Sequence, residues 1–435
     1  MTFRRRTLIG MMCCLLWCMT ALTHAQTVRE DVRVDIRRSA GFQTPYPNRS
    51  AEPLTPSPAG KKPFYISHYG CHGSRYNTTP ESYDTPYNIM AKADSLNKLT
   101  PLGRDVLRRI KLIRQDAHLR WGEITELGAQ QLADISTRML KHFPEVFSEN
   151  CNISGRSTTL TRCIMSMENA MLPFARRYSI IHHDATRRDT YYLNYVDKNL
   201  LAEQMDSLTR QRFNEFAARY EHPAPLMERL FNDTAYVSQE VDAAQLYTAI
   251  FRLAGNLQNL ELRRELTLYD LFTPDEAYSN WRKANAWSYI NYGGCTLNGG
   301  RQPYSQRILL RRMIEMADSC ISVPTPTVQL RFGDETGIIP LVCLLDMNGY
   351  AMATDDLDSL DQKGWADFRI SPMSANIQLI FYRANPQDDD VLLKVLLNER
   401  EATLPLPADH APYYRWQDFR KYYLKKLDDY VQNEE

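Results

Sequence analysis

A short apolar strand that opens into a loop of small, charged and aromatic residues constrains this chain more than any other feature. The run Phe64 to Ile66 predicts the strand, and the loop after it contains His72, Gly73 and Arg75. Reactive groups of α/β folds lie in loops at strand ends. Gly73 lets a ligand approach the backbone, and the planar fork of Arg75 suits phosphate oxygens. Imidazole beside guanidinium predicts phosphoryl transfer; a buried histidine and a surface arginine are the structural alternative.

Two further segments have the same layout, with charged residues at the end of a strand and a helix next. In residues 152–163, a Ser/Thr-rich turn directs backbone donors and an arginine, Arg156 or Arg162, to one place. The alternative is structural, with the arginine paired to a carboxylate at the sheet edge. Residues 327–337 alternate as a strand does, end in Gly and continue with Asp334 and Glu335 before a helix.

The loop motif Cys71-His72-Gly73-Ser74-Arg75 resembles the Arg-His-Gly-x-Arg signature of the histidine acid phosphatases. With Tyr76 directly after it, the motif is similar to that of the branch that contains phytases and multiple inositol polyphosphate phosphatases. The segments at 152–163 and 327–337 match the family in the same order, so the resemblance covers roughly residues 60 to 425. It implies a phosphoglycerate-mutase-like core, a phosphomonoester substrate and no cofactor or metal.

The resemblance also assigns roles to residues of this chain. His72 matches the histidine that is phosphorylated during turnover, and Arg75 and Arg162 match arginines that hold the phosphate. Arg162, before the helix, matches better than Arg156. Asp334 takes the place of a second phosphate-contacting histidine, and Glu335 takes the place of the proton donor. A glutamic acid can protonate a leaving alkoxide if its surroundings raise its pKa.

Two departures from the family pattern leave two functions open. Cys71 replaces an arginine and Asp334 replaces a histidine, so the site loses one positive charge and gains a negative one. Each charged contact in such a pocket contributes on the order of 2–4 kcal/mol. We therefore expect either an exported phosphomonoesterase of reduced efficiency, acting on inositol polyphosphates such as phytate through a phosphohistidine, or a non-catalytic relative that binds phosphate or sugar.

Strand and helix signals predict an α/β fold with a mixed-sheet core flanked by helices and a large helical insertion. Thr273-Pro274-Asp275-Glu276 is a strong helix start within the insertion, because it combines a Thr cap, an early Pro and a capping-box Glu. We expect an extended leader at 26–60, the α/β core at 61–180 and 323–430, and the inserted α-helical domain at 181–322.

The first 25 residues have the pattern of a secretory signal peptide. Arg4 to Arg6 precede an apolar run to about Leu22, and small residues near Ala25 suit cleavage. We expect a secreted or periplasmic chain with no stable membrane span after signal removal, in which the six remaining cysteines could pair. Basic and acidic residues number 52 each, without a basic tract, which gives no support for nucleic-acid binding. His182-His183-Asp184 is too weak a pattern to predict a metal site.

Overall fold

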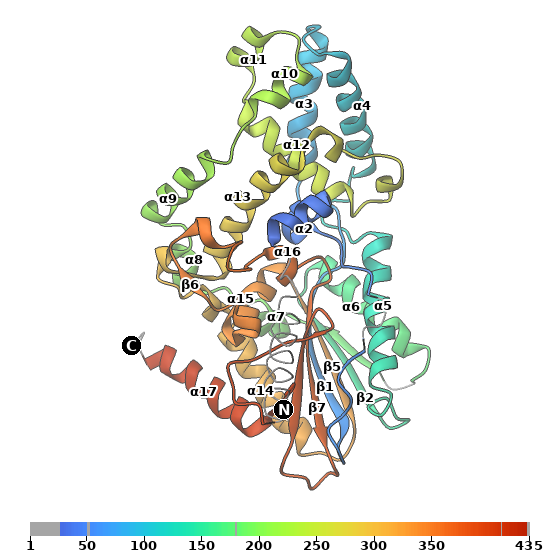
Figure 1. Ribbon diagram of the computed structural model, residues 1–435. Coiled ribbons are helices and arrows are strands. Elements are labelled where there is room, and N and C mark those ends of the chain that lie inside the picture. Colours follow the sequence, from blue (N-terminus) through green and yellow to red (C-terminus); the bar gives the residue numbers. More distant parts are fainter. Residues whose placement is uncertain (1–26, 50–52, 179–180, 410, 433–435) are drawn as a thin grey trace, which may run out of the picture.

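The computed structural model describes residues 27–49, 53–178, 181–409 and 411–432, and shows a mixed sheet beneath a helical cap (Figure 1). The sheet has the strand order β10-β8-β7-β1-β5-β2-β3, with β9 paired to β8. Parallel pairing joins β1, β5, β2 and β3, and antiparallel pairing joins the rest. The strands are β1 (Lys62–Cys71), β2 (Asn152–Ser157), β3 (Ile181–Ala185), β5 (Thr327–Gly333), β7 (Asn376–Arg383), β8 (Leu392–Leu397), β9 (Arg400–Glu401) and β10 (Tyr413–Arg415).

Strand β1 lies inside the sheet and is buried from Pro63 onward. It has β5 on one side in parallel and β7 on the other in antiparallel orientation. Helices cover both faces, so the strand has an apolar surround on each side, as is usual for parallel neighbours. The register places Cys71 opposite Gly333. The residues that follow β1 and β5 therefore leave the sheet at the same edge.

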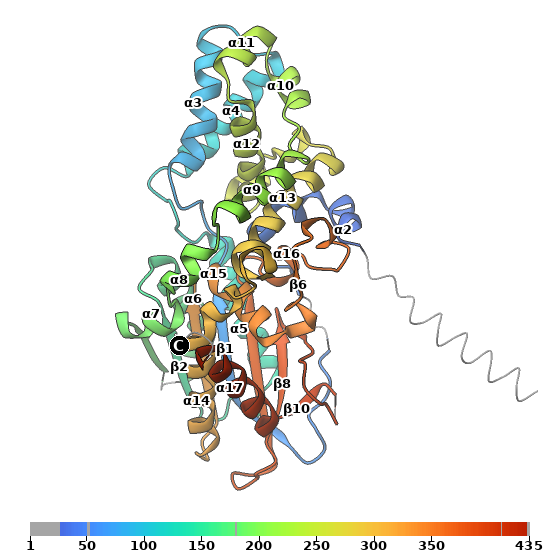
Figure 2. The ribbon, with the colours of Figure 1, turned by 90° about the vertical axis from the view of Figure 1, so that its left-hand side faces the viewer.

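Helices on the two faces enclose separate apolar cores. Helices α5 (Glu126–His142) and α6 (Thr161–Ala175) cover one face, where Leu132 and Met139 pack against Ile66 of β1. These residues belong to the apolar stripe of α5, which faces the sheet. The other face is covered by α14 (Arg307–Ile321), α15 (Glu335–Leu345) and α17 (Trp416–Gln432) (Figures 1 and 2). Tyr65 and Tyr69 of β1 belong to that second core.

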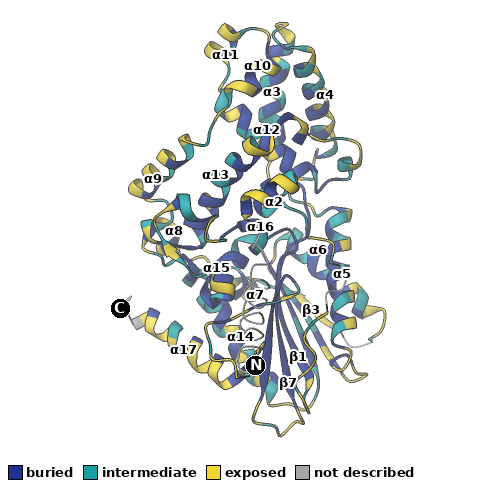
Figure 3. Ribbon diagram, in the orientation of Figure 1, coloured by how far each residue is buried: buried dark blue, intermediate teal, exposed yellow. Residues whose placement is uncertain are grey.

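The helical cap is assembled from three stretches of the chain. Its shared core joins Val32 of the N-terminal segment, Met90 and Ile110, and residues of the expected insertion such as Ile250 and Trp281. Figure 3 shows buried residues along the contacting sides of these helices and exposed residues on their outer sides. The members are α2 (Val28–Val34), η1 (Ile36–Gln43), α3 (Glu81–Ser95), α4 (Pro101–Asp116), α10 (Ala224–Leu230), α11 (Thr234–Glu240), α12 (Ala243–Leu257) and α13 (Pro274–Tyr292).

The cap and the sheet therefore meet at other residues than the expected boundaries. β3 continues the sheet to Ala185, and α14 packs on the sheet although both lie within 181–322. Conversely, α2 and η1 of the expected leader and α3 and α4 of the expected core pack on the cap. Apolar faces decide these memberships, because each amphipathic helix joins the core that buries its stripe. The predicted capping box of Thr273 and Glu276 is present at the start of α13.

Three features near the N-terminus and in the cores complete the description. The expected signal peptide, residues 1–25, lies outside the described residues. No helix within the described ranges is long and apolar enough to span a bilayer. The six cysteines that were expected to be available for pairing (Cys71, Cys151, Cys163, Cys295, Cys320 and Cys343) are all buried with free thiols.

Candidate active site

The loop after β1 holds His72 in one orientation. The imidazole is fully buried, and its Nδ1 lies 3.0 Å from the carbonyl oxygen of Gly73. Because a carbonyl only accepts, Nδ1 carries a proton and donates it, which turns Nε2 toward the site. The backbone amide of Ser374 donates to the His72 carbonyl at 3.0 Å. The sequence placed the candidate nucleophile correctly at a strand end, and the structure adds which ring nitrogen is presented.

Gly73 serves a different purpose from the one expected. A Cβ atom at Gly73 would lie 2.7–2.8 Å from backbone atoms of Gly128 at the start of α5. A Cβ at Gly128 would likewise lie 2.3 Å from the Ser74 carbonyl oxygen. The two glycines therefore permit the helix to approach the loop closely, whereas we had expected Gly73 to admit a ligand.

Arg75 and Glu335 meet His72 at its Nε2 atom. Glu335 Oε2 lies 2.5 Å from His72 Nε2, and Arg75 Nε lies 3.1 Å from the same nitrogen. Arg75 Nη2 donates to Glu335 Oε1 at 2.8 Å. Arg75 is itself buried, with 4% of its surface exposed. Three of the predicted residues thus form one cluster of nucleophile, cation and acid.

Asp334 and Arg162 form the second half of the site. Asp334 is the N-cap of α15 and accepts from the Glu335 amide at 3.1 Å. Its Oδ1 atom lies 3.2 Å from His72 Nε2, and its carboxylate forms a hydrogen-bonded ion pair with Arg162. All five predicted site residues therefore converge, and Arg162 also has the carboxylate partner of the structural alternative.

The charges of the cluster move both key pKa values. Burial disfavours the charged imidazole, but the charge of Glu335 and hydrogen bonds to Asp334 and Glu335 outweigh it, so the pKa of His72 is raised above its ordinary 6.5. Burial also favours the neutral acid, yet the charges of His72 and Arg75 bring the pKa of Glu335 well below its ordinary 4.5. A proton donor was expected to need a raised pKa; here the neighbouring cations lower it.

The remaining candidates lie outside this cluster. Cys71 points to the core on the α14 face, where its thiol contacts the Pro372 carbonyl oxygen at 3.8 Å and burial raises its pKa. Arg156 pairs with Asp189 instead of entering the site. His183 on β3 is exposed and pairs with Glu168 of α6.

One group of three possible metal ligands occurs among the described residues, and it is His72 with Asp334 and Glu335. Arg162 pairs with the first carboxylate and Arg75 with the second. Cations already neutralise both carboxylates, so this donor set fits guanidinium chemistry better than a divalent ion.

A buried amide that the sequence analysis did not single out supports the catalytic loop. Gln131 Oε1 on α5 accepts from the Ser74 amide and hydroxyl at 3.3 and 2.9 Å and from the Ser374 hydroxyl at 3.1 Å. The same Ser74 hydroxyl lies 2.8 Å from Asn259 Oδ1 of the cap, and its one proton serves either amide oxygen in turn. Thr125 caps the start of this helix, and a polar residue on its otherwise apolar stripe was the signal available in the sequence.

This fold, with histidine, two arginines and an acid after the ends of β1, β2 and β5, is that of a histidine-based phosphatase. The model of the histidine phosphatase superfamily (branch 2) matches residues 72–398, and the chain belongs to this family. Membership of this family supports phosphatase activity.

Solved structures share the fold at low sequence identity. The multiple inositol polyphosphate phosphatase of Bifidobacterium longum, solved with inositol hexasulfate, has a TM-score of 0.73 and 15% identity over 88% of this chain and 97% of that one. The phytase of D. castellii has a TM-score of 0.66 and 13% identity over 90% of this chain and 85% of that one. A Hafnia alvei phytase with myo-inositol hexakis sulphate has a TM-score of 0.51 and 12% identity over 85% and 98%. A comparison with curated proteins gives no match.

Proposed function

We propose that this protein is an exported phosphomonoesterase that acts on inositol polyphosphates such as phytate through a phosphohistidine. The observation that carries the proposal is the contact of His72 Nε2 with both Glu335 and Arg75, at 2.5 and 3.1 Å. Nucleophile, candidate proton donor and phosphate clamp share one point, which is where the phosphorus atom of a substrate has to lie.

The hydrogen bond between His72 and Glu335 gives the pair the proton that the reaction needs. A proton that moves from Nε2 to Oε2 leaves a neutral imidazole and a protonated acid. A phosphate dianion beside Glu335 favours this transfer, because it disfavours the carboxylate and raises its pKa. Nucleophile and general acid then become active together.

The reaction follows in two displacements. Nε2 attacks phosphorus in line, the bond to the leaving oxygen breaks, and Glu335 donates its proton to that oxygen. Arg75 and Arg162 exchange their carboxylate partners for the equatorial phosphate oxygens. In the second step Glu335 accepts a proton from water, which attacks phosphorus and releases His72 and inorganic phosphate.

The substrate class and the export rest on separate support. Relatives of the same fold are described as inositol polyphosphate phosphatases and phytases, two of them with sulfated inositols bound. Export rests on the signal-peptide pattern of the first 25 residues.

A specific contact favours the alternative, a non-catalytic relative that binds phosphate or sugar. Asp334, where the family has a histidine, pairs with Arg162 and lies 3.2 Å from His72. A phosphate has to displace this carboxylate from the arginine, which weakens binding and slows turnover.

Phosphate release from phytate by the purified protein decides between the two functions. A phosphatase releases phosphate at a rate that His72→Ala abolishes. His222→Ala is the matched control, because His222 is a histidine of the cap outside the cluster. Equal release by wild type and His72→Ala, or no release by either, would rule out the proposed mechanism.

A further inference from the structure

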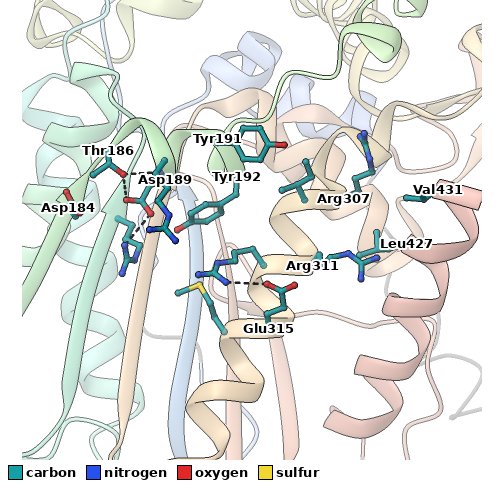
Figure 4. A pocket seen from close by; sticks show the side chains of 15 residues that line it. Asp184, Thr186, Asp189, Tyr191, Tyr192, Arg307, Arg311, Glu315, Leu427 and Val431 are labelled. Carbon is teal, nitrogen blue, oxygen red and sulfur yellow. Dashed lines mark hydrogen bonds and ion pairs between the residues drawn. The ribbon is translucent and has the colours of Figure 1, made fainter. Parts of the chain in front are cut away.

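A second cavity lies on the sheet face that α14 covers, away from the catalytic cluster. It has a volume of about 700 Å³, within the range of small-molecule sites. One wall is formed by β2, β3 and α7 (Arg187–Leu193), and the other by α14 and the last turns of α17 (Figure 4). None of the five catalytic candidates lines it.

Arginines face this cavity from both walls. Arg156, which is paired with Asp189 of the same wall, and Arg188 lie on the first wall, and Arg307, Arg311 and Arg312 lie on α14. The pairs of Arg311 with Asp428 and of Arg312 with Glu315 are solvent-exposed. Exposed ion pairs of this kind contribute little, about 0–1 kcal/mol, so an incoming oxyanion displaces them readily. Arg188 forms no ion pair with any described residue.

A buried charge without a counterion lies behind the residues that line the cavity. Arg331 of β5 is the cross-strand partner of Arg156 and is fully buried. It binds Ser67 Oγ, Gln329 Oε1 and the sulfur of Met316, a cavity residue, but no carboxylate among the described residues. Its Nε has no hydrogen-bond partner. A buried guanidinium without an opposite charge is costly, and so are like charges side by side in a sheet.

A buried hydroxyl group points to the same place. Tyr192 extends from α7 into the cavity (Figure 4) and is only 8% exposed. Its hydroxyl is buried and has no hydrogen-bond partner. Buried hydroxyls are normally paired, so an orphaned donor between arginines marks a missing acceptor.

We propose that this cavity binds a small molecule with two phosphate-type groups. One group accepts from Tyr192 and Arg156 and supplies the charge that Arg331 lacks, and the other binds Arg311 and Arg312 across the cavity. Two groups are required because the arginines stand on opposite walls. The site is distinct from the proposed catalytic one, so it does not depend on the proposed function.

Calorimetric titration with methylenediphosphonate, a bisphosphonate that phosphatases cannot hydrolyse, tests the site. The titration is done in an Arg75→Ala background, which weakens binding at the catalytic cluster. We expect one binding event, weakened about tenfold or more by Arg311→Gln with Arg312→Gln and several-fold by Tyr192→Phe. Arg108→Gln with Lys111→Gln on α4 is the matched control, because Arg108 also has an exposed partner three residues away.

The result has a clear opposite. If the Arg75→Ala protein binds no methylenediphosphonate at millimolar concentration, or if the α14 variant and the α4 control weaken binding equally, the proposal is wrong. Phosphate as titrant should bind more weakly than the bisphosphonate, because it spans only one wall; equal affinities would contradict the two-group site. Retained thermal unfolding of each variant verifies its fold.

Discussion

Asp334→Asn is the substitution that most directly tests how this site tolerates phosphate. Asp334 Oδ1 lies 3.2 Å from His72 Nε2, and only 8% of the residue is exposed. A phosphoryl group in line with Nε2 therefore brings its oxygens close to this carboxylate. Asparagine has the same shape and also caps helix N-termini, so α15 keeps its start.

The expected gain in kcat/KM follows from the negative charge that the substitution removes. Two unit charges about 4 Å apart repel by about 4 kcal/mol at an effective dielectric constant near 20. Part of this repulsion is already offset, because Asp334 also orients Arg162. A net change of about 1.4–2.8 kcal/mol corresponds to a tenfold to hundredfold increase in kcat/KM.

The assay is phosphate release from phytate and from p-nitrophenyl phosphate, with kcat and KM determined separately. Asp206→Asn is the control, because Asp206 is also the N-cap of a helix, α9 (Ser207–Ala218), and is far from His72 in sequence and contacts. The gain in kcat/KM should come mainly from a lower KM, and it should be seen with both substrates. A folded Asp334→Asn protein that is slower than wild type would refute the reasoning.

Three more predictions concern His72 and Glu335. Radiolabelled substrate quenched in alkali should leave phosphate on histidine, and His72→Ala should lose the label; a label that persists identifies another nucleophile. Glu335→Gln should slow the first displacement on phytate about 10²–10⁴-fold but hardly affect the burst of p-nitrophenol from p-nitrophenyl phosphate, whose leaving group needs no proton; equal losses in the first displacement would exclude Glu335 as the acid. Urea unfolding should show Glu335→Gln less stable by on the order of 1 kcal/mol between pH 4.5 and 6.5. The raised pKa of His72 contributes stability below pH 6.5, and this contribution is lost as pH rises through the pKa of the folded state. The lowered pKa of Glu335 contributes stability above pH 4.5, and this contribution is lost as pH falls through the pKa of the folded state. A difference in stability that does not depend on pH would contradict the ion pair.

Local patterns in the sequence were sufficient to place the catalytic candidates. Strand, loop and helix signals in three segments correspond to β1, β2 with α6, and β5 with α15. Each signal is short-range, because side-chain alternation, caps and glycines act within a few residues. The resemblance of the three segments to the histidine acid phosphatases also predicted that His72, Arg162 and Glu335 would meet.

The pairing of side chains was not available from those patterns. That Arg162 binds Asp334, and that Glu335 contacts His72, depends on rotamers and on the register of β1 with β5. Cap membership was equally hidden, because α2 and η1 join helices more than 200 residues away.

The position of β1 between β5 and β7 affects how the molecule is made. The antiparallel strand β7 pairs with β1 up to Gly70 and Asn376, and the Ser374 amide donates a hydrogen bond to the His72 carbonyl. Pairings so distant in sequence form late and slowly. A nascent chain that ends before Asn376 leaves one edge of β1 unpaired and open to aggregation. Truncation before Ser374 is therefore expected to remove both the pairing of β1 with β7 and the contact that Ser374 makes with His72.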